Sequence, residues 1–167
     1  MSFELIIFFV LGALAIASGI TTIRHKNPVV SAISLIFHFF MLAGLYLSLN
    51  AQFLAVLQIL VYAGAIMVLV IFVIMLLNLG DEEKLKEKFN MRKLIGTGFG
   101  VILALQFVII YMTTTTSGSS VASSSVGSPE VIGLDLFNNY LFPFEAISLL
   151  LLAAIIGSVI LAKRKVD

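Results

Sequence analysis

The sequence contains no cysteine and little charge. Without cysteine the chain can form no disulfide, no thiolate zinc site and no iron–sulfur cluster held by its own thiolates. Charged residues make up 11% of the 167 residues, whereas soluble globular domains contain about 25%. The net charge of +1 predicts no nucleic-acid partner. Glycine-rich nucleotide loops and a Ser/His/Asp catalytic order are also absent, so we expect no catalytic, metal-binding or cofactor-binding residue in this chain.

Apolar residues dominate instead, at 60% of the sequence and a mean hydropathy of +1.15. They occur in runs of about 20, the length that an α-helix needs to cross a bilayer. The runs are continuous rather than alternating, which argues against the strands of a membrane barrel. We therefore predict an all-α integral membrane protein, folded as a single membrane domain with five transmembrane helices. The predicted spans are 3–23, 28–49, 53–79, 93–112 and 143–162.

The ten lysines and arginines predict the orientation. All of them lie in the first connection, the third connection or the C-terminal tail, which share one side of a five-span chain. The positive-inside rule makes that side cytoplasmic, so the N-terminus is predicted outside and the C-terminus in the cytoplasm. The cations are Arg24, Lys26, Lys84, Lys86, Lys88, Arg92, Lys93, Lys163, Arg164 and Lys165.

The fourth connection, 113–142, is external in this topology. Its first half is rich in serine and threonine and is predicted to be a flexible loop. Its second half is apolar enough to lie along the membrane surface or to pack on a neighbour.

Small residues recur four positions apart in four of the five predicted spans. They are Ala15 and Gly19, Gly44 and Ser48, Gly96, Gly100 and Ala104, and Ala153 and Gly157. Small side chains let helix backbones approach closely, so the pattern predicts a chain embedded among other helices, its own or those of a partner.

The third predicted span combines polar residues with unusual length. It holds Gln58, Tyr62 and Gly64 within about 27 residues, or ~40 Å as an ideal helix, which exceeds the hydrocarbon core. The spacing of the residues favours a tilted helix as the explanation of this extra length. A π-bulge near Gly64 is the alternative, because glycine tolerates a local change of helical register. Gln58 and Tyr62 lie one turn apart, so together they could hold a water molecule or bond to another subunit. Glutamine has no titratable proton at physiological pH, so a proton passing here would move through water or a partner's carboxylate.

Three further titratable residues need an interpretation. Glu145 lies at the predicted start of the fifth span, where a structural cap facing the positive end of the helix dipole is favoured over a proton-handling group. His25 and His38 raise the hypothesis of haem ligation. His25 lies in the first connection and His38 about 15 Å deeper along the second helix, so they cannot bind one iron together within this chain, although a partner could supply a second ligand. His38 is predicted to be a packed, hydrogen-bonded histidine.

The chain resembles a known family in three stretches of sequence. These are Asn27-Pro28-Val29, the run from Gln58 to Leu69 and the run from Phe72 to Leu79. The block Val-Tyr-Ala-Gly-Ala-Ile-Met-Val-Leu in the second stretch is a specific signature. On these residues the chain is similar to subunit J of the proton-pumping NADH:quinone oxidoreductase, respiratory complex I, equivalent to mitochondrial subunit six. The similarity covers most of the chain except the charged third connection and the Ser/Thr-rich segment.

The resemblance implies a function and a setting. The chain would be a non-catalytic membrane-arm subunit that helps couple electron transfer from NADH to quinone with proton translocation. It would pack against subunits of the A, H, K and N types in the bacterial inner membrane, as a multi-pass protein. It would hold no cofactor, with FMN, iron–sulfur clusters and a nearby quinone belonging to the partner subunits.

The resemblance also bears on individual residues. In the family the third helix can hold a π-bulge around the positions of Tyr62 and Gly64, and its relaxation to α-helix accompanies coupling, so the resemblance favours a bulge over tilt. Some members carry glutamate where this chain has Gln58, whereas Glu145 falls on an acid that the family also shows. These four residues are the candidates for coupling or for a proton path.

Two other functions stay open on the sequence alone. One is an ion-translocation subunit of a related multisubunit antiporter or membrane-bound hydrogenase. The other is a passive assembly scaffold, in which substitutions at the candidate residues would leave turnover unchanged.

Overall fold

The computed structural model describes residues 3–77, 91–114 and 127–163, with the side chains of residues 91–94 and 114 left out. Five of the predicted cytoplasmic cations, Lys84, Lys86, Lys88, Arg164 and Lys165, therefore lie outside the described residues. The same holds for most of the Ser/Thr-rich segment that we predicted to be flexible.

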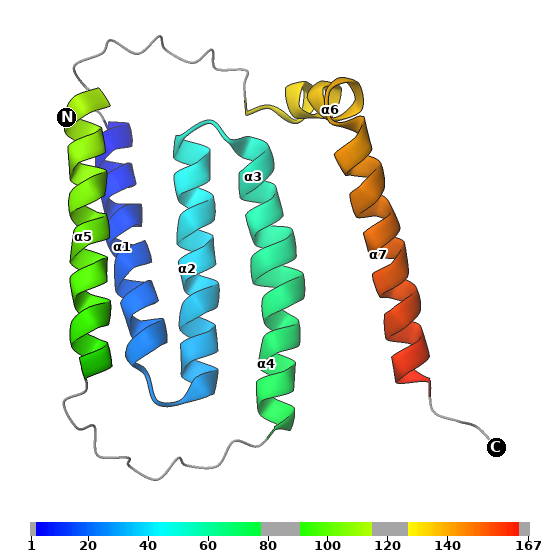
Figure 1. The fold of residues 1–167 in the computed structure, drawn as a ribbon, viewed down its shortest axis with the longest axis horizontal. Coiled ribbons are helices and arrows are strands. Elements are labelled where there is room, and N and C mark those ends of the chain that lie inside the picture. Colours follow the sequence, from blue (N-terminus) through cyan, green and yellow to red (C-terminus); the bar gives the residue numbers. More distant parts are fainter. Residues whose placement is uncertain (1–2, 78–90, 115–126, 164–167) are drawn as a thin grey trace. The chain divides into compact units, whose positions relative to one another are not determined.

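The described part is built from helices alone, and five of them are long and apolar enough to cross a membrane, which confirms the predicted fold class (Figure 1). The third span is a single run, Gln52–Leu76, made of three pieces. The elements are α1 (Phe3–Arg24), α2 (Pro28–Ser48), α3 (Gln52–Leu57), η1 (Gln58–Ile66), α4 (Met67–Leu76), α5 (Met91–Thr114), α6 (Pro129–Asn138) and α7 (Leu141–Ala162).

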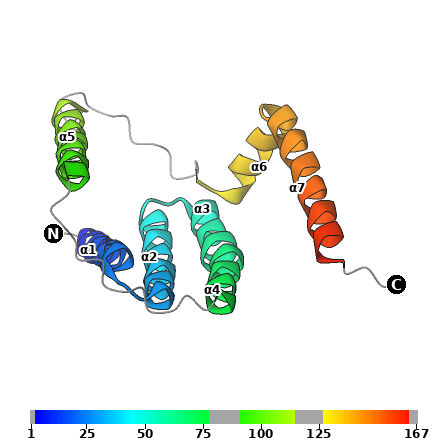
Figure 2. The same cartoon turned by 60° about the horizontal axis from the view of Figure 1, so that its bottom comes forward.

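Helices α1 and α2 and the α3–η1 part of the third span pack as consecutive antiparallel neighbours (Figures 1 and 2). The connection between α1 and α2 is short, and Asn27 ends it by capping α2. The side-chain oxygen of Asn27 accepts hydrogen bonds from the backbone N–H groups of Val29 and Val30 at 2.9 and 3.4 Å. Pro28 then supplies the φ angle of the first helical position. In the second turn Asn50 adopts a left-handed φ of 59°, a conformation that asparagine tolerates better than most residues.

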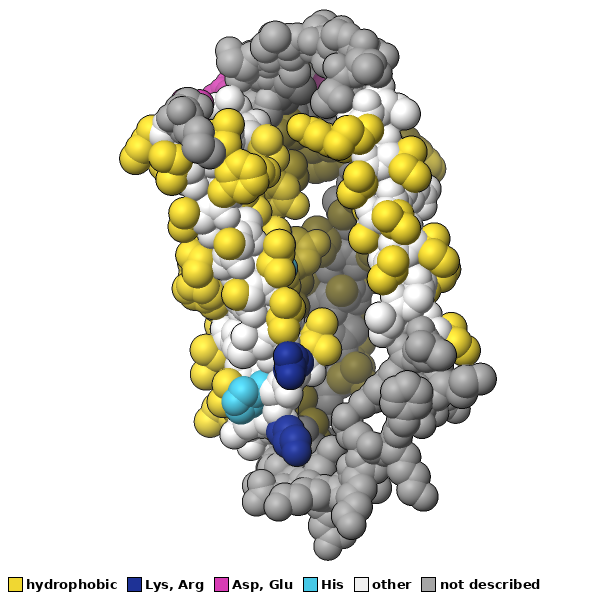
Figure 3. Space-filling model, turned by 90° about the vertical axis from the view of Figure 1, so that its left-hand side faces the viewer, with side chains coloured by type: hydrophobic (Ala, Val, Ile, Leu, Met, Phe, Trp, Pro, Cys, Tyr) yellow, Lys and Arg dark blue, Asp and Glu magenta, His cyan; other side chains and the backbone are white. Residues whose placement is uncertain are grey.

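Contacts between these helices are made mainly by small side chains. Within the described part the buried residues are Ala15, Ser18, Ala32, Ala43, Ala55, Gln58, Ala63 and Met67. Large apolar side chains point outward instead, and Figure 3 shows one face that they cover, with Lys, Arg and His side chains gathered at one end. Such a surface suits lipid or partner helices, because it would be unfavourable in water.

The second half of the fourth connection contains a helix, which we did not predict as such. Ser128 accepts a hydrogen bond from the Val131 N–H, and Pro129 occupies the first helical position, so α6 begins on a standard N-terminal signal. The backbone N–H of Glu130 and the Ser128 hydroxyl hydrogen-bond to the Glu130 carboxylate and lower its pKa. The ring of Phe137 then packs edge-on against Phe144 of α7, with centroids 5.1 Å apart.

Helix α5 belongs to a separate unit of the chain and is described by itself. Its described side chains are all exposed. A Cβ atom built at Gly96, Gly98 or Gly100 would meet no neighbouring atom within 4 Å. Gly100 serves below as a control position.

Candidate functional site

The third span changes its hydrogen-bond register in the middle. Gln58–Ile66 is a nine-residue π-helical segment between two α-helical pieces. At its end the Met67 N–H donates to the carbonyls of both Tyr62 and Gly64, and the bond to Tyr62 has the five-residue spacing of a π-helix. The bulge implied by the family resemblance is thus present, whereas tilt was the explanation that residue spacing alone favoured.

Gly64 lies where a side chain would disturb this segment. A Cβ atom at position 64 would stand 3.2 Å from the carbonyl oxygen of Ile59, five residues earlier in the same segment. That oxygen belongs to the backbone and cannot move aside as the end of a side chain can. Glycine at this position therefore lets the wide turn form without strain.

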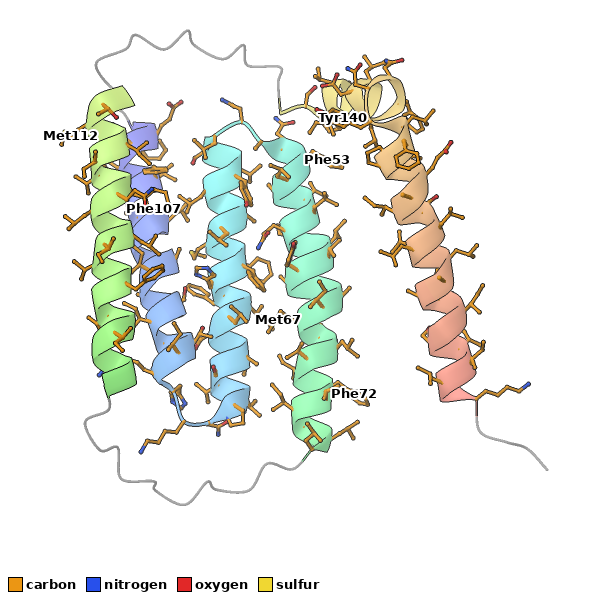
Figure 4. All side chains as sticks on the ribbon, in the orientation of Figure 1. Phe53, Met67, Phe72, Phe107, Met112 and Tyr140 are labelled. Atoms are coloured by element: carbon orange, nitrogen blue, oxygen red, sulfur yellow. The ribbon has the colours of Figure 1, made fainter. Side chains whose placement is uncertain are left out.

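The register change alters which residues the third span buries. Ala55, Gln58, Ala63 and Met67 are the buried residues of this span, each 7% exposed or less. The step from Gln58 to Ala63 is five residues, whereas uninterrupted α-helix would repeat after three or four. Figure 4 shows Met67 on the side of the helix that faces α2, and Phe72 on the opposite side.

Gln58 is a largely buried polar side chain, 7% exposed. Among the described residues no side-chain nitrogen or oxygen is both fully enclosed and unpaired, so the Gln58 amide keeps a small accessible edge at this contact. A primary amide offers two donors and an acceptor, and leaving them unpaired away from water is unfavourable. The site therefore calls for a water molecule or a polar group from another chain.

Tyr62 lies beside this position but is not buried with it. Its side chain is 48% exposed, and its ring packs edge-on against Phe39 of α2 at a centroid distance of 5.7 Å. The structure thus brings both residues to the contact with α2, with Gln58 inside the contact and Tyr62 at its edge. The aromatic partner Phe39 was missed by sequence reasoning, because a phenylalanine in an apolar run carries no signal of its own.

Glu145 differs from its predicted placement at the helix start. Helix α7 begins at Leu141, after the N–H of Tyr140 bonds back to Asp135 of α6, so Glu145 is the fifth residue of the helix. It is exposed, and its carboxylate makes no hydrogen bond or ion pair to any described residue. The cap interpretation is therefore wrong, and the residue is an uncompensated carboxyl group on an apolar helix.

The two histidines lie in different surroundings. His25 is exposed in the first connection, where its Nδ1 accepts a hydrogen bond from the Asn27 N–H at 3.2 Å. His38 is half-buried against α1, with Nδ1 2.8 Å from the carbonyl oxygen of Ala15 and 3.5 Å from the hydroxyl of Ser18. The packed, hydrogen-bonded His38 is confirmed. Sequence reasoning missed Ser18, although it lies between the small residues that we expected to contact a neighbour.

A known family matches nearly the whole of this chain. The model of NADH-ubiquinone/plastoquinone oxidoreductase chain 6 matches residues 18–161. Among curated relatives, NAD(P)H-quinone oxidoreductase subunit 6 from the chromatophore of Paulinella chromatophora is 39% identical over 96% of this chain and 78% of its own length. NADH-quinone oxidoreductase subunit J of Escherichia coli K12 is 34% identical over 89% of this chain and 81% of its own.

A third relative extends the similarity to an almost complete overlap. The chloroplastic NAD(P)H-quinone oxidoreductase subunit 6 of Chara vulgaris is 37% identical over 98% of this chain and 93% of its own length. The matched region includes the π-helical segment and all but the last residue of α7, and these two elements carry the four candidate residues. The chain belongs to the NADH-ubiquinone/plastoquinone oxidoreductase chain 6 family.

Proposed function

We propose that this chain is a membrane-arm subunit of an NADH:quinone oxidoreductase and helps couple quinone reduction to proton translocation. The observation that carries the proposal is a π-helical segment that holds a largely buried amide, that of Gln58, at the contact with α2. A π-helix and an α-helix differ by one residue of register, so one sequence can hold two arrangements that place different side chains in the contact.

Each candidate residue has a distinct part in this proposal. Gln58 orients a water molecule, because its amide can hydrogen-bond to water but cannot release a proton. Tyr62 supplies a hydroxyl at the edge of the same contact, and Gly64 permits the wide turn. Glu145 lies just beyond the first turn of α7, and its carboxyl group makes it the titratable member of the set.

The electron-transfer chemistry belongs to other subunits in this proposal. The chain contributes no cysteine for an iron–sulfur cluster, so FMN, the clusters and the quinone site lie in its partners. We place the subunit in the bacterial inner membrane beside membrane subunits of the A, H, K and N types. The exposed apolar side chains of its helices would meet those subunits and lipid.

Extraction of the native complex in mild detergent tests the assignment. We expect mass spectrometry to find this chain together with flavin and iron–sulfur subunits, and the same sample to oxidise NADH. Recovery of the chain with antiporter or hydrogenase subunits, in a sample without NADH oxidation, would contradict the proposal.

The orientation can be tested by single-cysteine labelling, because the chain has no cysteine of its own. With Lys26 and Lys163 on the cytoplasmic side, a membrane-impermeant maleimide should label Asn138→Cys in intact cells. It should label Lys26→Cys and Lys163→Cys only after the membrane has been opened. Labelling of Lys163→Cys in intact cells as fast as Asn138→Cys would reverse the proposed topology.

A further inference from the structure

His38 stands at the middle of a transmembrane helix, outside the set of residues proposed for coupling. It is the eleventh of the 21 residues of α2, about 15 Å from either end, which corresponds to the centre of the bilayer whichever way the helix points. Ionisable side chains at this depth are unfavourable unless they are paired, and they mark functional contacts more often than other residues do.

The contacts of His38 fix which ring nitrogen carries the proton. Nδ1 lies 2.8 Å from the carbonyl oxygen of Ala15, and a carbonyl oxygen can only accept a hydrogen bond. Nδ1 therefore donates, and in the neutral ring Nε2 is left with a lone pair as a hydrogen-bond acceptor. The Ser18 hydroxyl donates to the same carbonyl at 2.9 Å, so it holds the position of that oxygen rather than serving Nε2.

The orientation of the ring directs Nε2 away from this attachment. A Cβ atom at Gly19 would lie 3.7 Å from Nδ1 and 3.8 Å from Cε1, so the Nδ1–Cε1 edge of the ring faces α1. Within the described residues Nε2 makes no hydrogen bond, and the side chain is only half-buried by its own chain. Hydrocarbon offers no donor, and none of the described residues packed around α2 supplies one, so the free acceptor at this depth needs a donor from beyond these helices.

We propose that His38 Nε2 accepts a hydrogen bond from a polar side chain on a transmembrane helix of a neighbouring subunit. The imidazole would thereby join two contacts, donating to α1 through Nδ1 and accepting from the partner through Nε2. The neighbouring ring of Phe39 and the 46%-exposed Phe37 supply apolar surface on either side in sequence. This inference requires a partner subunit but does not depend on the coupling role of the third span.

Three substitutions separate the two nitrogens. His38→Asn places an amide N–H near the position of Nδ1 and keeps the bond to Ala15, but it leaves nothing at Nε2. His38→Gln reaches the position of Nε2 with an oxygen acceptor, and His38→Phe removes both functions while filling the space. Ser18→Ala is the matched control, because it changes the α1 side of the cluster and leaves Nε2 intact.

The measurement is the fraction of this subunit that dissociates from the purified complex as detergent is increased, quantified by mass spectrometry. We expect His38→Asn and His38→Phe to raise that fraction about three- to twentyfold, the range measured for hydrogen bonds between membrane helices. His38→Gln and Ser18→Ala should dissociate as the wild-type complex does. Membrane insertion of each variant, measured by its yield in the membrane fraction, should be unchanged.

Two results would overturn the proposal. If His38→Asn remains bound as firmly as the wild type, Nε2 faces lipid or water and the residue only joins α1 to α2. If His38→Gln dissociates as readily as His38→Asn, the shape of the imidazole matters rather than the acceptor.

Discussion

Replacement of Gly64 with valine is expected to lower the number of protons pumped per NADH oxidised, while the complex still assembles. The new Cβ atom would press on the backbone carbonyl of Ile59, which lies 3.2 Å away in the π-helical register. Forcing an extra group into a packed site typically costs about 1–3 kcal/mol. A bias of that size shifts the ratio of two helical registers by about 5- to 150-fold, so a mechanism that uses both registers would lose most of its coupling.

The effect should be graded and specific to this glycine. Gly64→Ala carries the same Cβ atom and should show a smaller loss, because it lacks the branched methyl groups of valine. Gly100→Val is the matched control, since a Cβ atom there meets nothing within 4 Å among the described residues. Proton uptake and NADH oxidation should be recorded together in proteoliposomes. Full pumping by the complex with Gly64→Val would show that the π-helical register has no part in coupling.

Replacement of Gln58 with leucine is expected to reduce proton pumping without destabilising the chain. Leucine fills a similar volume and brings no polar group that must be paired inside the contact, so we expect no loss of stability. The water molecule assigned to this amide would lose a hydrogen bond of roughly 1–1.5 kcal/mol, which corresponds to about a tenfold slower proton transfer. Gln58→Glu should retain pumping, because a carboxyl group also hydrogen-bonds to water.

Gln106→Leu provides the control for this substitution. Gln106 is exposed on α5, outside the π-helical segment, so its replacement changes the same residue type in another span. Pumping should be measured as quenching of a pH-sensitive dye at matched NADH oxidation rates. If Gln58→Leu pumps as well as Gln106→Leu, Gln58 only packs and the chain behaves as a scaffold at this position.

Much of the architecture follows from local properties of the sequence. The five spans were predictable because the length of an apolar run and the thickness of a bilayer decide whether a helix crosses it. The start of α2 was also readable, since Asn27 and Pro28 form a capping signal within one turn. The same kind of signal, Ser128 followed by Pro129, marks the start of α6. We did not predict that helix, because we interpreted this connection from its overall composition.

The candidate site depended on contacts between residues far apart in the chain. Gln58 and Tyr62 look equivalent at a spacing of four, yet one is 7% and the other 48% exposed, because the register change and the packing of α2 decide which side chain is enclosed. The role of His38 likewise depends on a distant residue, because its Nδ1 hydrogen-bonds to the carbonyl oxygen of Ala15, 23 residues earlier in the chain. Helical periodicity determines which residues share a face, but only the packing of helices determines what that face meets, and therefore which polar atoms are left unpaired within the membrane.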